Sequence, residues 1–213
     1  MWILTLLAVA CASPPSMVAH HADASVVRDA LVDGDLELAQ KHASKIEKRS
    51  FGDVDEAMAV HVTEVTTAAG AIVGARDVSA AAGQLGRLGA ACGACHTAGG
   101  GGPGGPATEA PPVVEGVAGE MQRHRWAATS MWDALVRGDD AGFKSAAEVM
   151  AQAPLTPSGT PVDSSLSPLA TELEVKAHDQ ALLAARSTDP SQRAGHYGQM
   201  LAACHACHAV VRR

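Results

Sequence analysis

The chain of 213 residues has few aromatic side chains, an excess of acidic over basic side chains, and no long apolar run. Aromatics make up 3% of it, so a helical domain has few large side chains with which to fill a core. Lys and Arg number 16 against 23 Asp and Glu, which argues against nucleic-acid binding because that requires a basic face. The apolar run at residues 2–10 is much shorter than the roughly 20 residues of a membrane-spanning helix.

Cysteine is also scarce, and four of the five cysteines lie in two C-x-x-C-H motifs. The residues of these motifs are Cys92, Cys95 and His96 in CGACH, and Cys204, Cys207 and His208 in CHACH. C-x-x-C is compatible with half of a zinc site, with a redox dithiol, or, when His follows at once, with covalent haem attachment. Paired zinc motifs lie roughly 15–20 residues apart, much closer than these two. A redox dithiol follows a strand, whereas the sequence before the first motif has a helical pattern.

Covalent haem attachment therefore explains the motifs best. Positions i, i+3 and i+4 share one face of a helix, so two thiols can reach the vinyl groups of one haem while the histidine binds its iron. The sequence predicts two covalent haem c groups, with Cys92, Cys95, Cys204 and Cys207 as attachment residues and His96 and His208 as iron ligands. A buried haem would also supply apolar bulk to a core poor in aromatics.

The N-terminal residues 1–16, MWILTLLAVACASPPS, predict an export signal. The apolar run fits a secretory h-region, and LAVAC resembles a bacterial lipoprotein signal cleaved before Cys11, with lipid on the Cys11 thiol. Ala8 stands where such signals favour Leu, and no Lys or Arg precedes the run. The alternative is an ordinary signal peptide cleaved nearby. Both interpretations predict export to the periplasmic side or the cell surface, and the first predicts a lipid anchor in the membrane.

The Gly- and Pro-rich segment 98–112 divides the chain into two halves that repeat each other. Residues 17–35 align with 121–139 without a gap, and DALV-GD recurs in both. The loop PLTPSGTP at 154–161 accounts for the extra length of the second half. Internal duplication is the simplest explanation, with domains at 17–97 and 113–213.

Helical periodicity predicts an all-α fold, because no segment alternates long enough for a sheet. The expected helices cover about 16–33, 35–49, 53–74, 77–97, 115–137, 139–152, 166–186 and 189–210. Short connections favour two tandem four-helix bundles with up-down-up-down topology.

A four-helix bundle with C-x-x-C-H late in its last helix resembles cytochrome c prime and its low-spin relatives. In that family a basic residue usually follows four positions after the motif histidine. Arg212 satisfies this in the second half, but Gly100 stands there in the first. The resemblance implies that the first helix of each half faces the distal side of a haem, and that the two halves pair as a pseudo-dimer.

The candidate distal ligands follow from the apolar stripe on the first helix of each half. His20 and His124 recur at the same stripe position, three residues after Met17 and Met121. We expect His20 and His124 as sixth ligands; Met17 and Met121, or an open position, are the alternatives. His21 is a weaker candidate, because Arg125 replaces it in the other half. We expect solvated or simple packing roles for His42, His61 and His178. We expect His205 to face solvent and His196 to lie near the edge of the second haem.

The predicted function is that of an exported dihaem cytochrome that passes single electrons between redox partner proteins. The alternative is a protein that binds NO or CO through a five-coordinate iron in one or both halves. A dihaem peroxidase is less favoured, because spacing alone reveals no Ser/His/Asp set, paired-carboxylate site or phosphate loop. We therefore do not expect an enzyme.

Overall fold

The computed structural model describes residues 15–102, 109–114, 116–152 and 167–212, and within them it is all-α, without strands. The eight helices are α1 (Pro15–Asp33), α2 (Leu36–Glu47), α3 (Glu56–Val73), α4 (Val78–Ala98), α5 (Val117–Arg137), α6 (Asp140–Met150), α7 (Pro168–Arg186) and α8 (Pro190–Val211). These agree with the predicted helices to within a few residues at each end, which confirms the all-α prediction.

Most helices begin at a side chain that accepts a hydrogen bond from the first turn. An aspartate caps α2, α3, α4, α6 and α8, and Ser167 caps α7. Such caps satisfy backbone N–H groups that have no partner within the helix. Gly138 ends α5 in the left-handed conformation, with φ at 70°, which costs glycine little because it has no Cβ. The helix boundaries are thus fixed largely by local chemistry, which explains why the sequence pattern found them.

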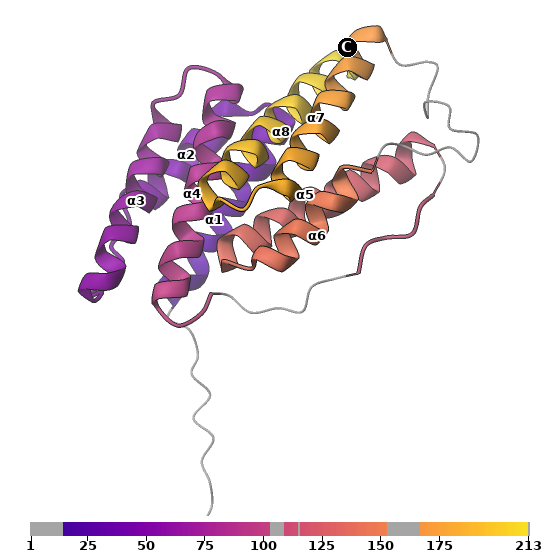
Figure 1. Ribbon diagram of the computed structural model, residues 1–213. Coiled ribbons are helices and arrows are strands. Elements are labelled where there is room, and N and C mark those ends of the chain that lie inside the picture. Colours follow the sequence, from indigo (N-terminus) through magenta and orange to yellow (C-terminus); the bar gives the residue numbers. More distant parts are fainter. Residues whose placement is uncertain (1–14, 103–108, 115, 153–166, 213) are drawn as a thin grey trace, which may run out of the picture.

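Each helix packs against the next one along the chain within each half, and the halves meet through α4 and α8 (Figure 1). The end of α4 also packs against α5, and the end of α8 against α1. In Figure 1, α4 and α8 lie together, with α2 and α3 on one side and α5 and α6 on the other. Helices from both halves therefore surround each motif-bearing helix.

The contact between α4 and α8 follows the sequence repeat. A Cβ at Gly86 would collide with the carbonyl oxygen of Ala194, and a Cβ at Gly198 would lie 2.5 Å from that of Ala82. Gly86 and Gly198 occupy equivalent positions in the two repeats, as do Ala82 and Ala194. The two helices therefore cross about a pseudo-two-fold axis, at a point where only glycine permits the approach.

The core is made mainly of alanine and aliphatic side chains. Trp132, Phe143 and Tyr197 are fully buried together in the second half, and Tyr197 donates a hydrogen bond to the Ala128 carbonyl oxygen. Elsewhere, small side chains let the helices approach closely, which compensates for the shortage of aromatics.

None of the described helices is long and apolar enough to cross a membrane. The predicted signal, including Cys11, falls almost wholly in residues 1–14, which lie outside the described part of the chain. The expected loop 154–161 also lies outside the described residues.

Candidate metal and cofactor sites

The two motifs occupy the last turns of α4 and α8, which brings each pair of cysteines and its histidine onto one helix. Burial raises the pKa of the Cys92 and Cys204 thiols to about 12, with a further contribution from the second cysteine of each motif. Burial also raises the pKa of Cys95 and Cys207. None of the four forms a disulfide. The cysteines are therefore protonated thiols at neutral pH.

The histidine of each motif is oriented by the opposite half of the chain. Nδ1 of His96 lies 2.7 Å from the Val136 carbonyl oxygen in α5, and Nδ1 of His208 lies 3.4 Å from the Val32 carbonyl oxygen in α1. A carbonyl only accepts, so Nδ1 must carry the proton and donate. Nε2 of each ring is then the nitrogen available to a metal ion, the arrangement found in most metal-binding histidines.

An apolar cavity of about 30 Å³ lies beside the first motif. Its lining comes from α1, α3, α4 and the segment before α3, and consists of His20, Phe51, Val62, Val65, Cys92, Cys95 and His96. The cavity therefore joins both thiols, the motif histidine and the predicted distal histidine. A porphyrin is much larger than this volume, so the elements that line the cavity would have to move apart to hold one.

His20 and His96 approach each other across this cavity. Both are buried, and their ring centroids are 5.9 Å apart with planes tilted by 47°. The cavity thus brings together two thiols and two imidazoles, which is a donor set that fits a haem.

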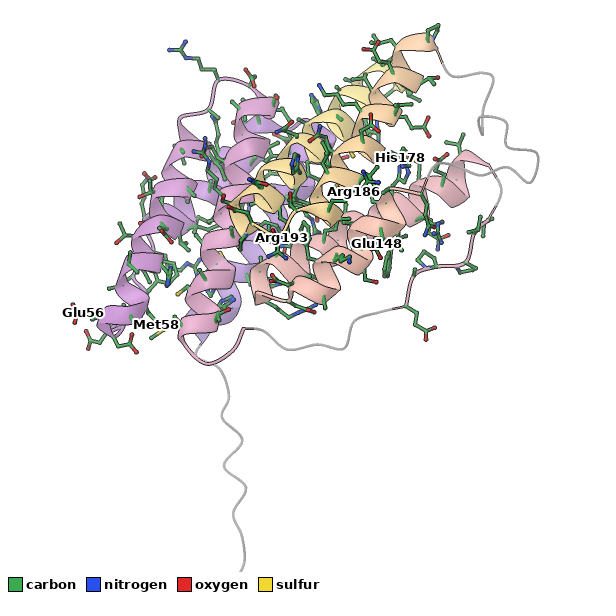
Figure 2. The ribbon with its side chains drawn as sticks, viewed as in Figure 1. Glu56, Met58, Glu148, His178, Arg186 and Arg193 are labelled. Carbon is green, nitrogen blue, oxygen red and sulfur yellow. The ribbon has the colours of Figure 1, made fainter. Side chains whose placement is uncertain are left out.

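The second half differs, because polar groups from α5 and α7 gather next to its motif. Glu120 and His124 lie one turn apart on α5, and Glu174 and His178 lie one turn apart on α7. The His124 and His178 rings meet edge to face with centroids 4.9 Å apart. Figure 2 labels His178 on α7.

The pKa values of Glu120 and His124 are shifted far from their ordinary values. Burial, together with the neighbouring Glu174 carboxyl, raises the pKa of Glu120 to about 8. Burial and the proximity of His178 and His208 lower the pKa of His124 to about 4. The pKa of Cys207 is raised by burial and then by Glu174 and Glu120, which places the cluster beside the second motif.

The structure corrects one expectation for the histidines. His205 was expected to face solvent, but its ring packs over Gly34 and its Nδ1 is shielded from water. Of the two roles expected for His178, packing is the one observed: the side chain is buried, and its Nδ1 donates to the Met150 carbonyl oxygen. His42 lies 2.8 Å from the Asp23 carboxylate, and His61 lies 3.1 Å from that of Glu64.

Two further predicted positions can be placed, Met121 and Arg212. Met121 is half-buried on α5, whereas the side chain of Met17 lies outside the described part of α1. Arg212 donates to the Asp33 carboxylate at 3.2 Å and so joins the end of α8 to the end of α1.

Glu120, Glu174 and His178 were not predicted as ligands from the sequence. The signal that could have found them is the recurrence of E-x-x-x-H, as EMQRH at 120–124 and EVKAH at 174–178. Comparison of the chain with family models, with curated proteins and with solved structures gave no match.

Proposed function

We propose that the protein is a dihaem c-type cytochrome that carries single electrons, with each half a four-helix bundle around one haem. Haem bound at each motif would supply one-electron chemistry at iron, while the chain provides ligands, burial and orientation. His96 and His208 would be the proximal ligands, with Cys92, Cys95, Cys204 and Cys207 as covalent anchors. His20 and His124 would be the distal ligands, with Met17 and Met121 as alternatives.

One observation carries this proposal: both motif histidines donate from Nδ1 to a backbone carbonyl of the opposite half. The two contacts occupy equivalent positions of the repeat, because Val32 aligns with Val136 as His96 does with His208. A zinc or dithiol role for C-x-x-C requires neither trailing histidine. The presence of His20 in the cavity that His96 also lines supports a six-coordinate iron in the first half, a state suited to electron transfer.

The second candidate function is NO or CO binding by the haem of the second half. The observation that favours it is the contact of His124 with His178, which gives His124 a partner other than iron. The second iron would then be five-coordinate, with its sixth position open to a gas.

The proposal includes export of the protein and electron exchange with partner proteins. Haem attachment of this type takes place outside the bacterial cytoplasmic membrane, in keeping with an export signal at 1–16. Lipid on Cys11 would tether the protein to a membrane, from which it would exchange electrons with redox partner proteins.

Spectroscopy of the exported protein tests these functions. We expect two covalent haems per chain, reduced to one in a Cys92→Ser/Cys95→Ser variant. Two low-spin ferric EPR signals without a CO-induced absorption shift would support electron transfer. A high-spin signal lost in a Cys204→Ser/Cys207→Ser variant would support gas binding in the second half. A protein exported with haem-attachment machinery but carrying no covalent haem would overturn both.

A further inference from the structure

We propose that Glu120, His124, Glu174 and His178 form a binding site for one divalent transition-metal ion, with Zn²⁺ the preferred occupant. The site shares His124 with the distal ligands proposed for the second haem, so the ion and that iron would compete for this side chain, and the site does not depend on haem attachment. It lies between α5 and α7, beside the second motif.

The distances bring the donor atoms together around one point. Oε1 of Glu120 lies 3.6 Å from Nε2 of His124 and 3.9 Å from Nε2 of His178, and Oε1 of Glu174 lies 4.0 Å from the same Nε2 of His178. One donor atom from each of Glu120, His124 and His178 lies within 4.8 Å of the others. Ligands bound tetrahedrally at about 2.1 Å lie about 3.4 Å apart, so side-chain rotations suffice to close the site.

Two buried atoms without a hydrogen-bond partner show why a cation fits between these groups. Nδ1 of His178 donates to the Met150 carbonyl, so Nε2 is the nitrogen that faces Oε1 of Glu120. Neither Oε1 of Glu120 nor Nε2 of His178 has a hydrogen-bond partner among the described residues, and both side chains are about nine-tenths buried. A metal ion bound between these two atoms would replace any proton held there and give each atom a partner.

The same hydrogen bond orients the ring. Metal-binding histidines usually donate their other N–H to a carbonyl or carboxylate, which fixes the tautomer and the direction of the free nitrogen. The α6 backbone at Met150 provides this support for His178.

The repeat supplies an internal comparison. Each E-x-x-x-H segment places its carboxylate and imidazole on one helix face, and the two segments face each other inside the second half. At the positions of His178 and Glu174, the first half has Thr66 and Val62. His124 thus has an equivalent in the first half, His20, whereas Glu120, Glu174 and His178 have none.

The donor set selects the class of ion. Ca²⁺ and Mg²⁺ prefer oxygen ligands, whereas two imidazoles with carboxylates suit Zn²⁺ and neighbouring transition metals. Two carboxylates would neutralise the charge of a dication in a buried position. While His124 holds this ion through Nε2, that nitrogen cannot also bind the second haem iron.

The test uses the exported full-length protein, treated with a chelator and with N-ethylmaleimide to block any free thiol. Titration with ZnCl₂ should show one ion bound per chain, and zinc X-ray absorption should show nitrogen and oxygen ligands, including two imidazoles. His178→Gln and Glu174→Gln should each weaken zinc binding at least tenfold. His61→Gln is the matched control, because it removes the histidine of a more exposed His–Glu pair on α3.

Each outcome decides the proposal. Loss of zinc in the His178→Gln and Glu174→Gln variants, with retention in His61→Gln, supports it. Failure of micromolar zinc to bind, zinc–sulfur scattering near 2.3 Å, or equal binding in all variants would overturn it. If His178→Gln lowers the helical circular dichroism, that variant is misfolded and its zinc binding is not interpreted. Zinc binding by Glu174→Gln and the zinc X-ray absorption spectrum of the wild-type protein then decide the proposal. Covalent haem is quantified in parallel, so failure of the haem proposal is recognised separately.

Discussion

Nδ1 of His96 lies 2.7 Å from the carbonyl oxygen of Val136, so the second half of the chain orients the first motif. The reciprocal contact joins His208 to Val32. Each half thus contributes a helix terminus to the other half's candidate site. The duplicated halves are interlocked, and a change at their interface should affect both sites.

Cleavage of the linker should leave the halves associated. A protease site placed at residues 103–108 breaks the covalent connection but not the α4–α8 contact or the ion pair between Arg212 and Asp33. After cleavage, the two fragments should elute together in size-exclusion chromatography at the volume of the intact protein. Elution as two separate species of about half the mass would contradict a stable association of the two halves.

The α4–α8 crossing should tolerate no side chain at Gly86 or Gly198. Either substitution by Ala places a Cβ against a backbone carbonyl of the other helix, and such overpacking costs about 1–3 kcal/mol. The melting temperature should fall in both variants.

Gly83 and Gly195 are matched controls for this prediction. They are equivalent helical positions on α4 and α8, and a Cβ at either would meet nothing within 4 Å. Their replacement by Ala should stabilise the protein by about 0.5–1 kcal/mol, because alanine loses less backbone entropy in a helix. Equal effects at all four glycines would show that the crossing is not the cause.

Replacement of His20 by Ala should convert the haem proposed for the first half from low-spin to high-spin. His20 lines the same cavity as His96, and its removal would leave the proposed iron without a sixth ligand. EPR of the ferric protein and CO binding to the ferrous protein report the change. His21→Ala is the control, since His21 is half-buried on α1 beside His20. An unchanged low-spin signal in His20→Ala would exclude His20 as the ligand.

The chain without haem should lose stability between about pH 9 and pH 12. Burial raises the pKa of Cys92 and Cys204 from 9.0 to about 12. Above pH 9 the unfolded chain therefore loses these protons before the folded chain does, and the free energy of unfolding falls as pH rises. Urea denaturation across this range should show a flatter dependence in a Cys92→Ala/Cys204→Ala variant. Identical slopes would show that these thiols are not the cause.

Much of the fold could be predicted because helix boundaries depend on neighbours in sequence. Caps such as Asp35 and Asp189 act within one turn, and the apolar stripe on α1 marks the face that Val27 and Leu31 bury. The candidate site of the first half was found because its ligands recur in register with those of the second. The Glu120–His178 contact was not found, because spacing within one helix does not show which helix lies opposite.

The sequence by itself determined the helices, the duplication and the two C-x-x-C-H motifs, since each depends on residues within a few turns or on direct repetition. Tertiary structure decided which groups meet. Packing of α4 against α5 and of α8 against α1 sends the motif histidines to carbonyls in the opposite half. Packing within the second half brings His178 to Glu120. These contacts join residues distant in sequence, and only the close approach of small-residue helices fixes them.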